Sequence, residues 1–429
     1  MDKHISSLLS FLDSSPCNFL AVDTVKKLLT DNGFSEQSLN SKFNLKQGAK
    51  VFFTKNDSAI FAVYLGKKSI AETGFKIIAA HSDSPCFRIK PNAVIKAENG
   101  IIKLNTEVYG GPILYTWFDR PLSLAGRVIV RSGDSLHPTT KLVKFDNPLL
   151  QIPHLAIHFN RAVNEGNPLS KQKDMLPIIA KINDSLQADS LILRLLSDKL
   201  HIAQSDIIDF DLMLYDTERA CTFGASNEFL SSGRLDDLSM VHAAVTAITE
   251  QDDSDQTLVV AIFDNEETGS GTKQGAGSPV LSNILLRLVE MQGGNFEDFA
   301  IAIEKSFMVS ADNAHAFHPN YAEKYDPTNH PALGGGPCIK INSNCKYMTD
   351  AHSAAIFKCL CEDANAPFQY FVNHSDVAGG STLGNILTGQ IDIEGVDVGN
   401  PLLAMHSVRE TGSVDDHLNM ITVFKKFFE

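Results

Sequence analysis

The pattern of apolar residues changes twice along the chain, and this feature constrains the fold most strongly. Up to about residue 92, and again after about residue 224, apolar strand-like runs alternate with helical patterns. Such alternation is typical of an α/β sheet with helices on both faces. We therefore predict a mixed, mostly parallel sheet flanked by helices. The expected helices span 3–13, 20–32, 240–248 and 414–428, and the expected strands span 50–64, 76–80, 258–263, 307–309, 339–342, 368–373 and 391–398.

The intervening segment has a different texture, with short β-rich runs separated by Gly, Pro and Asp turns. This spacing predicts a largely antiparallel unit. A chain of 429 residues is also too long for one simple core, because cores stop growing near ~250–300 residues. We expect an α/β domain made of residues 1–92 and 224–429, with a β-rich domain inserted at 93–223. The expected strands of the insert are 101–108, 122–130, 142–145, 155–159 and 191–196.

Composition narrows the class of protein. The formal net charge is −14, so the chain should repel the phosphate backbone of nucleic acids. It has no apolar run near the roughly 20 residues that span a bilayer, and its first residues do not resemble a secretory signal. The spacing of its seven cysteines does not resemble a disulfide framework. We expect reduced thiols, no membrane partner and a cytoplasmic location.

Histidine and carboxylate residues follow several of the predicted α/β strands. His81 ends one strand, Glu266 and Glu267 follow the next, and Asp312 follows a third. Ligands of open α/β sheets bind beyond the carboxyl ends of the strands, so these side chains should meet there. Two further candidates are His406, after the strand at 391–398, and Asp236, at the start of a helix.

Carboxylates that converge without a cation repel each other, and burying them costs about several kcal/mol each. A mixture of imidazole and carboxylate ligands suits zinc, with manganese or cobalt as alternatives. Two ions ~3.5–4 Å apart that share one carboxylate would use all five groups. The sequence therefore predicts a two-metal hydrolytic site built from His81, Asp236, Glu267, Asp312 and His406.

Two short motifs at this site suggest separate roles for neighbouring residues. Adjacent side chains diverge, so one of Glu266 and Glu267 should bind metal while the other acts as general base. His81 and Asp83 lie on one face of an extended strand, so Asp83 should accept the second ring N–H of His81.

Together, these motifs resemble the aspartyl aminopeptidases, which are relatives of the wider di-zinc aminopeptidase clan. The matching segments occur in the family's order over nearly the whole chain. They are 80–86 (AHSDSPC), 107–111 (EVYGG), 116–120 (TWFDR), 124–127 (LAGR), 152–158 (IPHLAIH), 234–237 (RLDD), 264–267 (DNEE), 310–316 (SADNAHA), 379–382 (GGST) and 404–410 (AMHSVRE).

The resemblance implies a role for each residue of the metal site. His81 and Asp312 would hold one zinc, Glu267 and His406 would hold the other, and Asp236 would bridge the two. Glu266 would be the general base that activates a water between the metals. From its position beside His81, we also count Asp83 among the catalytic residues. The resemblance also implies a cis peptide bond between Asp236 and Asp237, although some relatives carry Asn at the second position.

The resemblance further implies a substrate and an assembly. Family members remove N-terminal Asp or Glu from peptides, and Lys340 matches their specificity lysine. Tyr347 resembles a substrate-contacting tyrosine, and His315 a histidine beside the site. The inserted domain would mediate dimerisation, the dimers would build a tetrahedral dodecamer, and His158 would reach into the active site of the partner protomer.

Two other function classes stay open at this point. A di-zinc deacylase or carboxypeptidase would use a similar metal shell, and a catalytically silent assembly protein could retain the fold. The glycine-rich segment 269–277 does not have the order of a phosphate-binding P-loop, and we expect its glycines to let the backbone turn.

Overall fold

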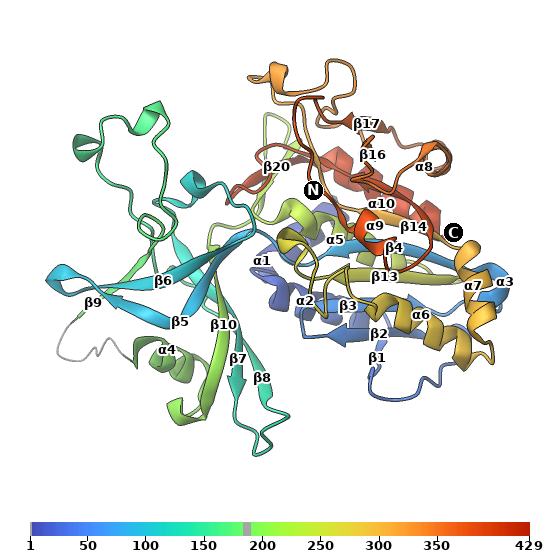
Figure 1. Cartoon of the computed structure of the whole chain (residues 1–429), viewed down its shortest axis with the longest axis horizontal. Coiled ribbons are helices and arrows are strands. Elements are labelled where there is room, and N and C mark those ends of the chain that lie inside the picture. The colour runs from blue at the N-terminus through green and yellow to red at the C-terminus, as the bar shows by residue number, and fades with distance from the viewer. Residues whose placement is uncertain (1, 183–189) are drawn as a thin grey trace. The chain divides into compact units, whose positions relative to one another are not determined.

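The computed structural model describes residues 2–182 and 190–429 (Figure 1). It divides into two compact units. The first comprises Met1–Asp83, Ala220–Met405 and Glu410–Glu429, and the second comprises Ser84–Arg219 and His406–Arg409.

The first unit is built on a nine-stranded mixed sheet. Five of its eight strand pairings are parallel, including those that join the three central strands β13, β4 and β14. Across the sheet the order is β1 (Ser35–Glu36), β2 (Lys50–Lys55), β3 (Ala59–Tyr64), β13 (Thr257–Phe263), β4 (Phe75–His81), β14 (Phe307–Ala311), β18 (Glu394–Gly399), β16 (Cys338–Ile341) and β17 (Gln369–Val372).

Helices cover both faces of this sheet, because successive strand residues point to opposite sides. In β4, Ile78 and Ala80 pack into one buried cluster, whereas Ile77 and Ala79 pack into the other. These two apolar layers confirm the predicted α/β architecture. The first cluster includes residues of α1 (Lys3–Ser14), α2 (Asn18–Asp31), α5 (Leu235–Thr249), α8 (Ala351–Asp363) and α10 (Val414–Phe428), and the second includes residues of α3 (Ile70–Thr73), α6 (Val280–Met291), α7 (Phe296–Glu304) and α9 (Leu383–Leu387).

Two small sheets complete the first unit. One joins β11 (Cys221–Phe223), β12 (Phe229–Ser232) and β20 (Glu410–Ser413), and the other joins β15 (Ala314–His315) and β19 (Pro401–Leu402).

The second unit contains a six-stranded antiparallel sheet. Its order is β8 (Thr139–Lys144), β7 (Leu122–Val130), β10 (Ile207–Asp216), β5 (Cys86–Lys96), β6 (Ile101–Tyr109) and β9 (Ile178–Lys181).

Two predicted strands of this region are wrong. Residues 191–196 lie in helix α4 (Leu191–Leu200), which buries Leu191, Ile192 and Leu196 on one side. Residues 155–159 are exposed and contain a short 3₁₀ turn at Ile157–Phe159. A short apolar run does not by itself distinguish a strand from a helix or from an exposed loop, which explains both errors.

Two further observations concern the cysteines and the helices. All seven cysteines are free. Within the described residues, none of the helices combines the length and apolar character that a bilayer crossing requires.

A buried histidine pair joins three helices of the first unit. His242 of α5 and His417 of α10 are each 1% exposed. His242 Nδ1 lies 3.0 Å from His417 Nε2, and His242 Nε2 lies 3.0 Å from the hydroxyl of Ser7 in α1. Burial lowers the pKa of both rings, well below the usual value for His242 and to about 3 for His417. Both rings are therefore neutral at pH 7 in the folded chain.

This pair should make the fold sensitive to acid. The unfolded chain binds protons on these rings near pH 6.5, whereas the folded chain does not, so stability should be lost as the pH falls below ~6.5. Each ring should contribute a loss of roughly 1.4 kcal/mol per pH unit. Melting temperatures measured from pH 7 to 5 should fall more steeply for the native chain than for a His242→Gln/His417→Gln variant. The exposed His137→Gln control should keep the native slope, and equal slopes in all three proteins would contradict the assignment.

Candidate metal centre

Three neighbouring parallel strands deliver polar side chains to one edge of the large sheet. Strand β4 lies between β13 and β14, and its last residue, His81, is in register with Phe263 at the end of β13. Residues 264–267 continue from β13, and Asp312 follows β14 directly. The parallel arrangement brings these three strand ends together, as the sequence pattern predicts.

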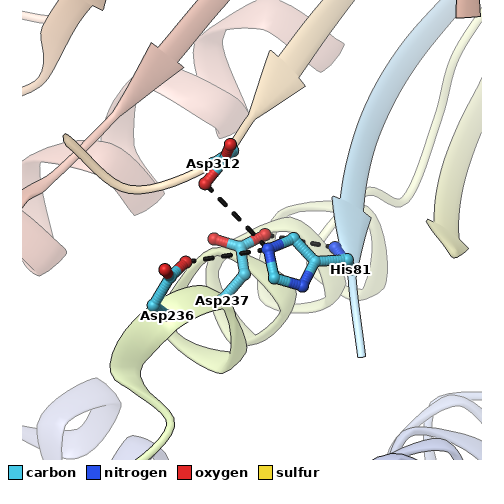
Figure 2. Close-up of side chains that lie close together, drawn as sticks. All are labelled: His81, Asp236, Asp237 and Asp312. Atoms are coloured by element: carbon cyan, nitrogen blue, oxygen red, sulfur yellow. Dashed lines mark hydrogen bonds and ion pairs between the residues drawn. The ribbon is translucent and has the colours of Figure 1, made fainter. Parts of the chain in front are cut away.

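His81 lies among three buried carboxylates, which Figure 2 shows around its ring. His81 Nε2 is 3.6 Å from a carboxylate oxygen of Asp236 and 4.0 Å from one of Asp312. His81, Asp236 and Asp312 are 1%, 3% and 8% exposed. Asp236 enters from the start of α5, where its main-chain N–H donates to the buried Glu410 carboxylate at 3.0 Å. The structure therefore brings together the three residues expected to share one metal.

Asp237 and Asn313 form a support for this cluster that sequence reasoning did not identify. The peptide bond between Asp236 and Asp237 is cis. The fully buried Asp237 carboxylate accepts the main-chain N–H of His81 at 3.1 Å and the side-chain amide of Asn313 at 3.1 Å. The Asn313 amide also donates to the Leu235 carbonyl at 3.0 Å. In the sequence, the only sign of these roles is that Asp237 follows Asp236 and Asn313 follows Asp312.

Asp83 holds the turn that carries the two glutamates. One of its carboxylate oxygens accepts the main-chain N–H of Glu266 at 3.1 Å, and the other accepts that of Glu267 at 3.2 Å. The His81 ring contacts Asp83 chiefly through the main-chain carbonyl, at 3.0 Å from Nδ1, whereas the carboxylate is 3.5 Å away. Asp83 therefore orients both His81 and the glutamate turn, but through different atoms from those expected.

The glutamate pair lies beside the same histidine. Ligand atoms of His81, Glu266 and Glu267 all lie within 4.8 Å of one another. The pair sits on a short 3₁₀ turn, between Asn265 and Gly269 in left-handed conformations. The sharp turn places two consecutive carboxylates at the sheet edge.

The electrostatics of the cluster fit a divalent cation. Burial raises the pKa of Asp237 well above its usual range, raises that of Asp312, and raises that of Glu266 to about 8. Burial opposes the charged form of His81, but the nearby charges of Asp237, Asp236 and Asp83 raise its pKa well above the usual value. So many buried carboxylates need a countercharge, and a metal ion held by imidazole and carboxylate ligands supplies one.

A buried cation borders the cluster. Lys340 of β16 is 3% exposed, and its ammonium lies 3.4 Å from a carboxylate oxygen of Asp312. The ammonium also lies 5.7 Å from the ring centre of the buried Tyr347. The exposed His315 packs edge-on against Phe371, which pairs with Lys340 across β16 and β17. Three of the four predicted substrate residues, Lys340, Tyr347 and His315, thus gather around one patch of the first unit.

The remaining predicted residues, His158 and His406, belong to the second unit. His158 is exposed in the turn Ile157–Phe159. His406 Nδ1 lies 3.1 Å from the carbonyl oxygen of Gly111. A proton on Nδ1 in that contact would leave Nε2 as the nitrogen with a lone pair.

Comparison with known proteins identifies the family. The model of the family described as aminopeptidase I zinc metalloprotease (M18) matches residues 11–428. The chain belongs to this family. The M18 chain is 51% identical over 426 residues to a probable M18 family aminopeptidase 2 of Clostridium novyi, covering 99% of this chain and 98% of that protein. It is 38% identical to a probable aspartyl aminopeptidase of Ricinus communis, covering 99% and 94% of the two chains.

Solved structures of similar proteins share the fold. The Ape4 and Nbr1 complex contains a chain that superposes with a TM-score of 0.95 at 36% identity, covering 99% of this chain and 85% of that one. The S. cerevisiae mApe1 dodecamer gives a TM-score of 0.85 at 25% identity, covering 99% and 95%. The protein is therefore a metal-dependent M18 aminopeptidase, and the buried cluster at His81 fits the zinc of this metalloprotease family.

Proposed function

We propose that this M18 aminopeptidase releases N-terminal Asp and Glu from peptides. The observation that carries the proposal is the buried ammonium of Lys340 beside the metal cluster. A protein with a net charge of −14 repels acidic peptides at long range, so a pocket for an acidic side chain needs a local cation. Lys340 supplies that charge, and the similarity to a probable aspartyl aminopeptidase points the same way.

For the metal centre, we propose two zinc ions per subunit, with manganese or cobalt as functional substitutes. His81 and Asp312 would hold one ion, Glu267 and His406 the other, and Asp236 both. The contact between His406 and the Gly111 carbonyl supports coordination through Nε2. When bound, the ions would polarise the scissile carbonyl and lower the pKa of water.

Glu266 would serve as the proton-transfer group. Its carboxylate lies beside His81, and its backbone is held by Asp83. Burial and neighbouring carboxylates raise the pKa of Glu266 to about 8, while the nearby His81 charge opposes this shift. A bound cation would pull the pKa down towards neutrality, the range in which a general base works best. Glu266 would take the proton of the attacking water and return it to the leaving amine.

A substrate panel tests this function. The purified protein, loaded with zinc, manganese or cobalt, should cleave Asp- and Glu-nitroanilides faster than Ala- and Leu-nitroanilides. An N-acetylated Asp-nitroanilide should resist cleavage, because an aminopeptidase requires a free amino group. Release of acetate from the blocked substrate would indicate a deacylase, and release of C-terminal residues from a peptide with a free carboxyl end would indicate a carboxypeptidase. Inertness to every substrate would indicate a silent assembly protein.

We also propose self-association through the second unit, as dimers that build a tetrahedral dodecamer with His158 reaching the partner's active site. Three large apolar side chains around His158 are exposed. Leu155, Ile157 and Phe159 are 57%, 53% and 82% exposed. Clustered exposed apolar residues are typical of interaction surfaces. The solved dodecamer of mApe1 supports this assembly.

Light scattering should therefore detect an assembly of about twelve 46.9 kDa chains. An Ile157→Ser/Phe159→Ser variant should dissociate into smaller species, because it removes apolar area from the proposed contact. A Leu136→Ser variant is the matched control, since Leu136 is 85% exposed in another loop of the same unit. A native chain with the mass of a monomer would contradict the assembly.

A reducing compartment such as the cytoplasm is the proposed location. Free thiols persist where glutathione and thioredoxin keep cysteines reduced, and all seven cysteines of this chain are free.

A further inference from the structure

A second pocket in the first unit has an electrostatic character opposite to that of the whole chain. It has a volume of about 320 Å³ and is lined by Lys55, Lys273 and Arg287, with no Asp or Glu among its lining residues. The chain as a whole carries a net charge of −14. Three cationic side chains around one cavity of such a protein favour an anionic ligand.

Structural contacts hold two of these cations at the pocket wall. Arg287 of α6 donates to the carbonyl oxygens of Leu39 and Ser41, and its guanidinium stacks over the ring of Phe43 at 3.8 Å from the centroid. The Lys273 ammonium donates to the side-chain oxygen of Asn56 at 3.0 Å. A preordered charge loses little conformational entropy when a ligand binds, which favours recognition.

Lys55, at the end of β2, differs from the other two cations. Among residues 2–182 and 190–429, no ion pair or hydrogen bond engages its ammonium. Its side chain is half-buried at the pocket, and its charge is therefore available to a ligand.

The start of helix α6 adds to the positive potential. Pro279 and Val280, which begin this 12-residue helix, line the pocket. No side chain caps this end, and its first turn contains no acidic residue. The N–H groups at a helix start favour anions. Leu39, Val280 and Ile284 contribute an apolar part of the lining.

We propose that this pocket binds a small organic anion, with a phosphate or carboxylate group against the cations and a compact apolar body against Leu39, Val280 and Ile284. Its volume lies in the range of small-molecule sites. The pocket shares no lining residue with the metal cluster or with the patch around Lys340. Lys273 belongs to the glycine-rich segment 269–277, but it would contribute its side-chain charge and not a P-loop backbone. Anion binding here would be independent of the proposed peptide specificity.

Calorimetry with the metal-loaded protein tests the proposal. Phenyl phosphate should bind saturably with a Kd of about 1 mM or tighter, inorganic phosphate about 10-fold more weakly, and phenol not measurably. A Lys55→Gln/Lys273→Gln variant should weaken phenyl phosphate binding at least about 10-fold, because it removes two of the three charges. Equal affinity for inorganic phosphate would overturn the apolar part of the proposal, and absence of saturable binding would overturn all of it.

A matched variant and a kinetic readout separate this pocket from other anion sites. Lys67→Gln/Lys68→Gln changes the charge equally but alters exposed lysines that pair with Asp253 and Asp255, so binding should stay within about twofold of native. Phenyl phosphate at the pocket should not raise the KM for an amino-acid nitroanilide. Competitive inhibition with a constant that equals the calorimetric Kd, unchanged in the Lys55/Lys273 variant, would place the anion at the metal centre and overturn the proposal.

Discussion

Replacing Glu266 by Gln should lower kcat about 10²- to 10⁴-fold, the range that a general acid–base group contributes. Glutamine preserves the shape of the side chain and leaves the main-chain N–H of residue 266 in its bond to Asp83. It removes the carboxylate that would take the proton of the attacking water. The KM should change little, because the substrate contacts proposed for Lys340 would remain.

Metal content distinguishes loss of the base from loss of the site. Zinc bound per chain, measured by elemental analysis, should match the native protein in Glu266→Gln, because Glu266 is not one of the proposed ligands. Glu290→Gln is the control, since Glu290 is exposed at the far end of α6 and should keep native kcat. Native turnover in Glu266→Gln would show that another group is the base.

Replacing Lys340 by Met should lower kcat/KM for Asp- and Glu-nitroanilides about 100-fold while changing the values for Ala and Leu substrates only severalfold. Methionine keeps most of the buried volume but removes the ammonium that lies 3.4 Å from Asp312. A hydrogen bond to a charged group is worth about 1.5–3 kcal/mol, and a buried carboxylate left without its cation costs more. The loss of kcat/KM should therefore be large for the acidic substrates and small for the neutral ones.

The control for this specificity test comes from a neighbouring segment. Lys346 is exposed one residue before Tyr347, so Lys346→Met removes an equal charge close by and should leave the substrate preference unchanged. Because Asp312 is a proposed metal ligand, zinc content must be measured in Lys340→Met as well. A loss of equal size on acidic and neutral substrates would make Lys340 a support of the metal centre and would contradict its role in specificity.

The sequence determined the architecture of the large sheet. It also determined which polar residues lie at the edge where the parallel strands end. The strand segments 77–80 and 258–263 are apolar throughout because helices cover both faces, and that pattern is readable without coordinates. A polar residue directly after such a strand has a defined place, since parallel strands end at one edge. His81, Asp312 and the 266–267 glutamates were identified on this basis. Short runs such as 191–196 were assigned wrongly. Strands and helices can both bury one side, so this pattern does not distinguish them.

Only the tertiary structure decided how these groups are held. Asp83 supports the glutamate turn with its carboxylate and His81 mainly with its carbonyl oxygen, a division that spacing along a strand does not predict. Asp237 and Asn313 brace the cluster through bonds between segments about 75 residues apart or more. The cationic pocket likewise combines β2, the loop after Glu267 and α6. Such arrangements depend on long-range packing, which brings together side chains whose separation in the sequence carries no periodic signal.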